Sequence, residues 1–212
     1  MKVVIAGTDT EIGKTWFASR VIETLRTAGV RVAARKVAQS FTRDDLGCTD
    51  AELLAAATGE DPTTVCPEAH WYSLAMAPPM AASRLGRAPF TIADLVASIA
   101  PSAADVMLIE SAGGVRSPLA DDGDTVALCR ALRPDLVAIV ADARLGCINA
   151  VRLATDVLRE HHTVVALNRF EAADELHHAN LEWLRARDGL DIVSDAEAVA
   201  RRIETAFRGL RS

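Results

Sequence analysis

The chain has 212 residues, the length of one ordinary domain, and it is half hydrophobic and one quarter charged. This composition excludes a mainly disordered chain, and the formal net charge of −6 excludes a general basic surface for nucleic acid. No apolar run reaches the roughly 18 residues that a membrane span needs, and the four cysteines lack the spacing of a zinc site. We therefore expect a cytoplasmic protein with free thiols and without nucleic-acid or membrane partners.

Short apolar runs alternate with helical patterns along the chain. The apolar run at 2–6 precedes an amphipathic stretch at 13–28, and a second strand is predicted at 30–36. Residues 60–90 hold five of the eight prolines and predict loops and a short helix. The other predicted elements are helices at 50–58, 91–100, 124–132, 147–160, 174–187 and 195–208, and strands at 105–110, 135–141 and 163–168.

The later strand segments are almost wholly apolar, which is typical of central parallel strands that are covered on both faces. Strands that alternate with helices predict right-handed βαβ units. We therefore predict a single α/β domain over residues 1–212, a doubly wound and mostly parallel sheet with helices on both faces. Ligands of such sheets bind at the carboxyl ends of the strands.

Residues 7–15, GTDTEIGKT, fit the phosphate-loop pattern G-x-x-x-x-G-K-[ST] between a predicted strand and a predicted helix. Backbone N–H groups and the start of the helix would bind phosphates, and Lys14 would reach the β- and γ-phosphates. The Thr15 hydroxyl would bind Mg²⁺. The motif predicts a nucleoside triphosphate site of the P-loop NTPase type, with nucleotide-binding residues Gly7, Thr8, Asp9, Thr10, Glu11, Ile12, Gly13, Lys14 and Thr15.

Two carboxylates are placed where such a ligand would bind. Glu110 ends an apolar strand and precedes a turn of small residues, and Asp50 begins the second predicted helix. Carboxylate oxygens are ligands that Mg²⁺ prefers, so Thr15, Asp50 and Glu110 predict a magnesium site. The alternatives are that Asp50 caps its helix and that Glu110 is a surface acid at the end of its strand.

Several blocks, in the same order and spacing, resemble the dethiobiotin synthetase family over about residues 1–170. The Thr10-Glu11 pair in the phosphate loop is distinctive of that family. Asn168, at the end of a predicted strand, resembles the asparagine that contacts adenine there. The other similar blocks are RKVA at 35–38, TDA at 49–51, ESAGG at 110–114 with Pro118-Leu119 after it, and LGCIN at 145–149.

The resemblance implies a homodimeric, ATP- and Mg²⁺-dependent carboligase of biotin biosynthesis. Its diamine substrate, 7,8-diaminononanoate, would capture CO₂ or bicarbonate as a carbamate, which ATP phosphorylates before ring closure to the cyclic urea. By the same resemblance, Lys14 bridges the carbamate and the γ-phosphate, and Lys36 stabilises the carbamate and orients the diamine. Residues 145–149 would receive the terminal carboxylate of the substrate across the dimer interface.

The residues implied by the resemblance fall into three groups. The catalytic residues are Thr10, Glu11, Lys14, Lys36 and Ser40. The substrate-binding residues are Lys36, Ser40, Gly113, Gly114, Gly146, Cys147, Ile148 and Asn149. ATP-binding residues are those of the phosphate loop together with Asn168, and the metal ligands are Thr15, Asp50 and Glu110.

The sequence also departs from the family. Val37 directly follows Lys36 where the family has a proline, either Gln39 or Ser40 fills the family's serine position, and Arg35 adds a second charge. No proline follows Pro134, so the usual adenine-binding end is not found. The alternatives are therefore a paralogous ATP-dependent ligase for a different amine or carboxylate, and a nucleotide-switch ATPase of the partition or metallocentre-maturation type.

Two further segments bear on the pocket. The loop at 40–48 is predicted to be compact, because it leaves few residues before the helix at 50–58. Trp71 and Tyr72, close to the Met- and Pro-rich stretch at 76–80, predict either the lining of a substrate pocket or part of a dimer contact.

Overall fold

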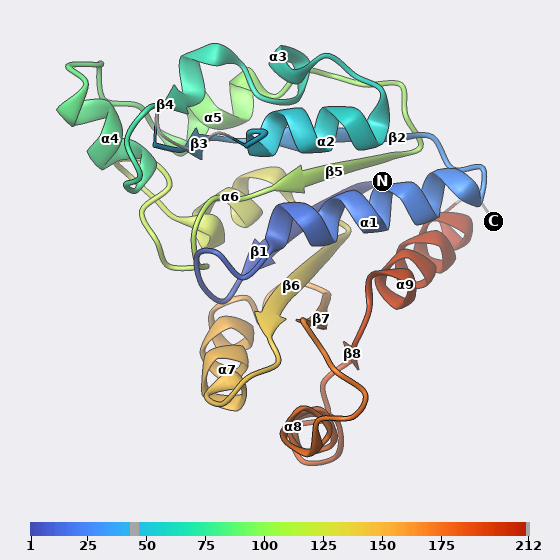
Figure 1. The fold of residues 1–212 in the computed structure, drawn as a ribbon. Helices are drawn as coiled ribbons and strands as arrows, with labels where there is room; N and C mark the ends of the chain where they lie inside the picture. Colours follow the sequence, from blue (N-terminus) through green and yellow to red (C-terminus); the bar gives the residue numbers. More distant parts are fainter. Residues whose placement is uncertain (43–46, 211–212) are drawn as a thin grey trace.

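The computed structural model describes residues 1–42 and 47–210, which are built around a six-stranded sheet (Figure 1). The strand order is β2-β5-β1-β6-β7-β8, and the described pairings are all parallel. Strand β1 lies inside the sheet, with β5 and β2 on one side of it and the later strands on the other. The strands are β1 (Lys2–Gly7), β2 (Val32–Lys36), β5 (Val106–Glu110), β6 (Leu136–Asp142), β7 (Thr163–Asn168) and β8 (Ile192–Val193).

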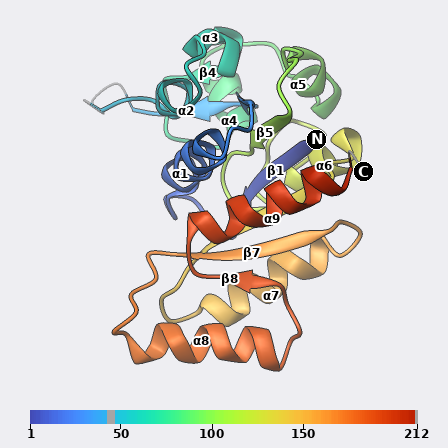
Figure 2. The same cartoon turned by 90° about the vertical axis from the view of Figure 1, so that its right-hand side faces the viewer.

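Two layers of helices cover the sheet, because successive side chains of a strand point to opposite faces. Val3 and Ile5 of β1 belong to the core under α1, α2 and α9, whereas Val4 and Ala6 belong to the core under α5, α6, α7 and α8. Figure 2 shows α9 beside α1, with α7 and α8 further along the sheet. These helices are α1 (Lys14–Thr27), α2 (Asp50–Thr58), α5 (Ile92–Ser98), α6 (Thr125–Leu132), α7 (Cys147–Val157), α8 (Glu175–Ala186) and α9 (Ala196–Gly209).

The predicted fold class is confirmed, and each long predicted strand and helix is present. The bounds of α2 and β7 are as predicted, and the ends of the other elements are shifted. Several short elements were not predicted. Residues 60–90 contain more than loops and one helix, and β3 and β4 form a separate two-stranded parallel sheet. The short elements are β3 (Gln39–Ser40), α3 (Pro62–Val65), the 3₁₀ helix η1 (Glu68–His70), β4 (Trp71–Tyr72) and α4 (Pro78–Arg84).

The described part of the chain has no helix that is both long enough and apolar enough to cross a membrane. The loop that we predicted to be compact, 40–48, includes residues 43–46, which lie outside the described residues.

Candidate active site

The phosphate loop lies between β1 and α1, at the carboxyl edge of the sheet. Gly13 ends it in the left-handed conformation (φ 81°), which glycine adopts without steric cost. A Cβ at Gly7 would lie 2.6 Å from the Lys14 side chain, so a larger residue here would displace that side chain from its place beside the loop. Glu11 is also left-handed (φ 56°), which costs energy in a residue with a side chain.

The Lys14 side chain is buried beside this loop. Its Nζ donates a hydrogen bond to the carbonyl oxygen of Asp9, 2.8 Å away. Burial and the neighbouring Lys36 ammonium lower the pKa of Lys14 to about 8. Glu110, Asp50 and Asp9 oppose this shift without cancelling it, and phosphate oxygens bound in the loop would further favour the ammonium.

Thr15, Lys36, Asp50 and Glu110 form one polar cluster, the carboxylate cluster, beside Lys14. Thr15 Oγ1 lies 2.8 Å from both Asp50 Oδ1 and Glu110 Oε1. The Lys36 ammonium lies 2.7 Å from Asp50 Oδ2 and 2.5 Å from Glu110 Oε1. The structure thus brings together four residues that are far apart in the sequence.

The fold explains why these four side chains meet. Lys36 and Glu110 are partners in the register of β2 and β5, so their side chains lie on the same face of the sheet. Thr49 is the N-cap of α2 and forms a capping box with Glu52. The alternative that Asp50 caps this helix is therefore wrong, and the alternative that Glu110 is a surface acid is wrong because it is fully buried.

Charge coupling within the carboxylate cluster shifts the pKa values of its members. Burial disfavours the charged form of Lys36, but Asp50 and Glu110 outweigh it and raise the pKa of Lys36. Burial also disfavours the charged form of Asp50, but the Lys36 ammonium outweighs this effect and lowers the pKa of Asp50. Burial raises the pKa of Glu110 in spite of Lys36. Lys36 therefore stays an ammonium over the whole neutral range.

The carboxylate cluster fits a magnesium ion that binds together with a nucleotide. Glu110 Oε2 is buried and has no hydrogen-bond partner among the described residues. Mg²⁺ typically takes one or two carboxylates together with substrate phosphates, and Thr15, Asp50 and Glu110 offer that donor set. Within residues 1–42 and 47–210, no group of three or more His, Cys, Asp or Glu side chains could hold a metal ion. The site therefore suits a metal that arrives with phosphate rather than one held by protein alone.

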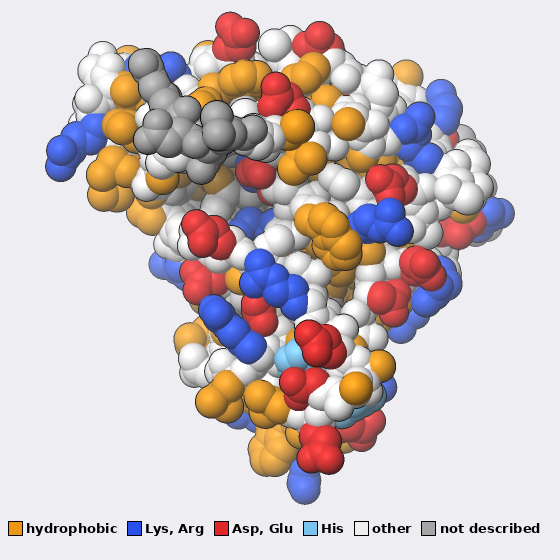
Figure 3. All heavy atoms as spheres, viewed as in Figure 1, with side chains coloured by type: hydrophobic (Ala, Val, Ile, Leu, Met, Phe, Trp, Pro, Cys, Tyr) orange, Lys and Arg blue, Asp and Glu red, His pale blue; other side chains and the backbone are white. Residues whose placement is uncertain are grey.

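These side chains line a cleft of about 730 Å³. Figure 3 shows the surface hollowed here, with acidic and basic side chains close together at the opening. Residues 75–78, which include Met76, add an apolar wall; Tyr72, in contrast, is buried in the core. The predicted residues that line the cleft are Thr10, Glu11, Gly13, Lys14, Thr15, Lys36, Ser40, Asp50, Glu110 and Gly113.

Gly114 packs against the phosphate loop and does not line the cleft. A Cβ at Gly114 would lie 3.1 Å from the carbonyl oxygen of Thr8 and 3.5 Å from the Asp9 Cα. The structure therefore places this predicted substrate-binding residue against the backbone of the phosphate loop rather than in the lining of the cleft.

Gln39 and Ser40 both line the cleft, but their side chains are engaged differently. Gln39 Oε1 accepts a hydrogen bond from the Ala51 N–H at the start of α2, 2.9 Å away. Ser40 Oγ and Gln39 Nε2 are buried and have no hydrogen-bond partner in the part of the chain that the structure describes. Gln39 is held to α2 through Oε1, whereas the Ser40 hydroxyl makes no hydrogen bond with the described residues that would fix it, so Ser40 is the first candidate to test.

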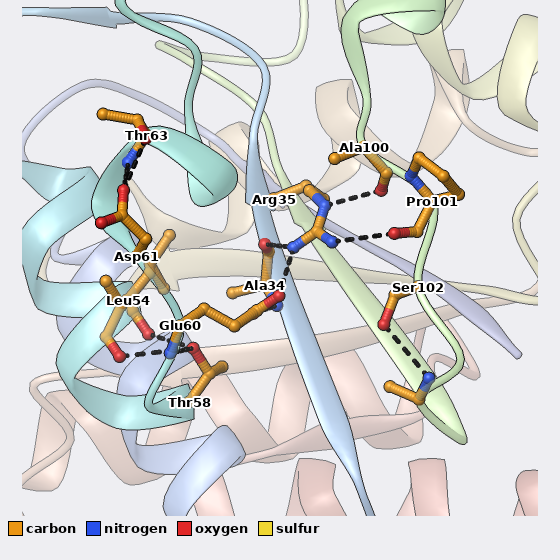
Figure 4. A network of polar contacts seen from close by, with 12 residues as sticks. Ala34, Arg35, Leu54, Thr58, Glu60, Asp61, Thr63, Ala100, Pro101 and Ser102 are labelled. Carbon is orange, nitrogen blue, oxygen red and sulfur yellow. Dashed lines mark hydrogen bonds and ion pairs between the residues drawn. The ribbon is translucent and has the colours of Figure 1, made fainter.

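Arg35 does not line the cleft, so its charge does not act directly on a substrate there. Its guanidinium forms an ion pair with Glu60 at 2.7 Å and donates a hydrogen bond to the carbonyl oxygen of Ala100 at 2.8 Å (Figure 4). Glu60 Oε2 also accepts a hydrogen bond, at 2.8 Å, from the Ala34 N–H of the edge strand β2. This network ties the outer edge of the sheet to α2 and to the loop before β5.

A second pocket, of about 440 Å³, lies beside the phosphate loop. Asn168 borders it, and its Nδ2 donates a hydrogen bond to the Ile12 carbonyl oxygen at 2.7 Å. Arg169 is left-handed (φ 56°) and joins the Glu11 carbonyl oxygen (2.7 Å) to the Asp142 carboxylate (2.8 Å). No pattern in the sequence predicts this contact of Arg169 with the phosphate loop, because the contact joins residues more than 150 positions apart.

Residues 145–149 lie at the start of α7 and line neither of these two pockets. Gly146 is the left-handed N-cap of the helix (φ 94°). Cys147 is buried and Ile148 half-buried, whereas Leu145 is 80% exposed and Asn149 is exposed. The structure therefore does not bring this predicted substrate contact to the cleft of its own chain.

Comparison with known proteins identifies the family. The chain matches the family model described as an AAA domain over residues 1–199. It is 38% identical over 162 residues to the ATP-dependent dethiobiotin synthetase BioD of Chromohalobacter salexigens, covering 73% of this chain and 67% of the relative. This chain belongs to the dethiobiotin synthetase family. The synthetase of Methylobacterium nodulans is also similar, 36% identical over 169 residues and 74% of each chain. The predicted family and enzyme class, an ATP-dependent ligase, are confirmed.

Solved structures share the fold with this synthetase family member. A plasmid partition protein from Borrelia burgdorferi has a TM-score of 0.55 at 12% identity and covers 99% of this chain and 96% of its own. The septum site-determining protein MinD of Pyrococcus horikoshii, complexed with Mg-ADP, has a TM-score of 0.51 at 17% identity and covers 99% and 86%. At such identities the likeness shows the fold alone and does not favour the nucleotide-switch alternative.

Proposed function

We propose that this protein converts 7,8-diaminononanoate and CO₂ to dethiobiotin, with ATP and Mg²⁺. The observation that carries the proposal is that Lys14 and the carboxylate cluster, which includes Lys36, line one cleft beside the phosphate loop. Two ammonium groups at a phosphate loop suit a reaction in which a carbamate and a triphosphate, both anionic, must approach each other.

In the proposed reaction, one amine of the substrate adds to CO₂ and loses a proton, which gives a carbamate. A carbamate oxygen then attacks the γ-phosphorus of ATP, and ADP leaves. The second amine attacks the carbamate carbon, and phosphate leaves as the ring closes. The protein supplies position and positive charge for these steps and little covalent chemistry.

The family resemblance implies a role for each side chain, and its place in the cleft is consistent with that role. Lys36 would face the carbamate oxygens, and Lys14 would lie between the carbamate and the γ-phosphate. Thr10 and Glu11 would close the phosphate-loop side of the site. Thr15, with the carboxylates of the cluster, would hold Mg²⁺, which when bound offsets charge on the β- and γ-phosphates.

The apolar part of the cleft supports an aliphatic diamine as the substrate. Met76, Ala77 and Pro78 line one part of it, and Ala112 and Pro118 also lack polar side-chain groups. Such surface would exclude water from an alkyl chain while the polar end of the cleft binds the two amines.

We further propose a homodimer in which residues 145–149 of one subunit complete the cleft of the other. The start of α7 offers N–H groups and the positive end of a helix, which suit a carboxylate. Leu145 of this segment is 80% exposed and Leu153, further along α7, is 60% exposed, so this part of the chain offers apolar area for a contact between subunits.

The decisive experiment measures ADP release by the purified protein with Mg-ATP and bicarbonate, with and without 7,8-diaminononanoate, and detects the cyclic urea by mass spectrometry. Lys14→Met and Lys36→Met are expected to lower the rate by several powers of ten, since each removes a charge that faces the transferring group. Lys2→Met is the matched control, because Lys2 is exposed and donates to the Leu132 carbonyl oxygen away from the cleft.

The outcomes separate the candidate functions. Diamine-dependent ADP release with formation of the urea supports the proposal. ATP turnover stimulated by a different amine or carboxylate supports a paralogous ligase. A change between monomer and dimer on ATP binding, without turnover of any amine, supports the nucleotide-switch alternative.

A further inference from the structure

Trp16 is a large aromatic side chain at an unusual place on the surface. It directly follows Lys14 and Thr15 in the first turn of α1, and its side chain is 59% exposed, whereas Phe17 beside it is 1% exposed. Trp16 is the one large exposed hydrophobic residue among the described residues of α1, and an apolar patch interrupts the polar surface over that helix in Figure 3. The fold itself does not need an indole here, because Phe17, Val21 and Ile22 supply the buried face of α1.

Trp16 also borders two spaces at once. Together with Gly13 it lines both the cleft of about 730 Å³ and the second pocket of about 440 Å³. Lys14 and Thr15 line the first of these spaces and not the second. Trp16 therefore lies at the boundary that the cleft and the second pocket share.

The second pocket has the make-up of a site for a flat ligand with polar edges. Asn168 and Phe170 border it after β7, and Ser194 and Asp195 border it before α9. Its volume of about 440 Å³ lies within the range of small-molecule sites. Its lining thus combines aromatic residues with polar side chains, of which Asn168 donates a hydrogen bond to a backbone carbonyl oxygen and Asp195 accepts one from a backbone N–H.

We propose that the indole of Trp16 is a stacking wall for the nucleobase, so that it determines affinity for nucleotides but not for phosphates. The proposal rests on the proposed ATP-dependent function. Every base has a π-face, and stacking of a base on an aromatic side chain changes affinity on the order of ten-fold or more when the side chain is removed. Phosphate binding would stay with the backbone of the phosphate loop and Lys14.

Calorimetric titration with Mg-ATP and with magnesium tripolyphosphate, which has no base, tests the assignment. Trp16→Leu is expected to weaken ATP binding by on the order of ten-fold and to leave tripolyphosphate binding unchanged. Trp16→Phe keeps an aromatic face and is expected to retain most of the ATP affinity. Trp183→Leu is the matched control, because Trp183 is also exposed (47%) but lies on α8 and borders neither space.

Tryptophan fluorescence gives a second measurement. ATP is expected to quench the emission of the wild-type protein, and the quenching is expected to vanish in Trp16→Phe although ATP still binds. Unchanged ATP affinity in Trp16→Leu would overturn the inference, and so would an equal loss for ATP and tripolyphosphate, which would mean that the phosphate loop itself had shifted. Failure of the wild-type protein to bind ATP at all would instead overturn the proposed function.

Discussion

At the scale of single residues, Ser40 lines the cleft and has a buried hydroxyl that the fold itself does not use. Its Oγ has no partner among the described residues, so replacing the hydroxyl by a hydrogen removes a buried polar group that makes no hydrogen bond. We expect Ser40→Ala to leave the free energy of unfolding unchanged or slightly higher, and to raise the KM for the diamine on the order of ten-fold. Steady-state kinetics and urea unfolding of the same variant measure both effects.

Gln39 provides the contrast for this prediction. Because Gln39 Oε1 accepts a hydrogen bond from the Ala51 N–H, Gln39→Leu is expected to lower the free energy of unfolding by about 1–3 kcal/mol, through an unpaired buried N–H group. If Ser40→Ala has normal kinetics while Gln39→Leu alone raises the KM for the diamine, Gln39 fills the serine position of the family instead.

The lysines of the chain allow a direct test of the charges in the cleft. The sequence has three lysines, and two of them, Lys14 and Lys36, lie in the cleft. The pKa of Lys14 is lowered to about 8, so near that pH a large share of its amine is uncharged and nucleophilic, whereas the pKa of Lys36 is raised. We expect a small acylating reagent at about pH 8 to modify Lys14 and not Lys36 in the native protein.

Peptide mass spectrometry locates the modified amines, and exposed Lys2 reports the activity of the reagent. Mg-ATP is expected to protect Lys14, because phosphate oxygens favour its charged form and cover it. Modification of Lys36 before Lys14, or no protection by ATP, would contradict the charge arrangement described for the cleft.

At the scale of elements, β3 of the two-stranded sheet β3–β4 lines the cleft, and a buried histidine directly precedes β4. His70 directly precedes β4, and its ring packs 5.9 Å from the ring of Phe90, which stacks on Tyr72. Burial and nearby Arg87 lower the pKa of His70, although Asp94 opposes this shift. The imidazole is therefore neutral in the folded protein at neutral pH.

This shift predicts a pH dependence of stability. Between the lowered pKa and the ordinary value of 6.5, the unfolded chain binds a proton at His70 that the folded chain does not. The free energy of unfolding is therefore expected to fall as the pH is lowered through about 6.5, and the fall to be smaller in His70→Gln. Urea unfolding of both proteins between about pH 7.5 and pH 5.5 measures the difference; parallel curves would show that His70 makes no contribution.

The same elements show what sequence patterns can and cannot predict. The long strands were found because their apolar runs reflect burial on both faces, and the helix after the phosphate loop because its apolar face repeats. Strands β3, β4 and β8 have two residues each, too few to establish a period. Their pairing is decided by neighbours in space, such as Val165 and Ala166 beside β8.

At the scale of the whole molecule, the cluster of Thr15, Lys36, Asp50 and Glu110 could be anticipated because each lies at the end of an element that a parallel sheet directs to one edge. The second pocket could not, because it arises where segments distant in sequence pack together. For the Met- and Pro-rich stretch, the sequence left a pocket lining and a dimer contact as alternatives, and residues 75–78 line the cleft. The role predicted for residues 145–149 cannot be judged from one subunit, because these residues are predicted to complete the cleft of the partner subunit.

A mixing experiment tests that role at the level of the assembly. Asn149 is exposed in the first turn of α7, so Asn149→Asp is expected to preserve the helix, where an acidic residue is favourable, and to repel a substrate carboxylate. Lys14→Met removes a charge from the cleft itself. If each site draws Lys14 from one subunit and Asn149 from the other, a heterodimer of the two inactive variants contains one intact site.

Random exchange of subunits makes half of the dimers heterodimers, each with one intact site of two, so the mixture should recover about one quarter of the wild-type activity. The control is a mixture of two variants that both carry Lys14→Met, and this mixture should recover no activity. Activity that stays at the level of the separate variants, after mass spectrometry has shown that heterodimers formed, would place residues 145–149 in the same subunit's site or outside the site altogether. Because the start of α7 borders neither pocket of its own chain, recovery of activity would require the partner's cleft.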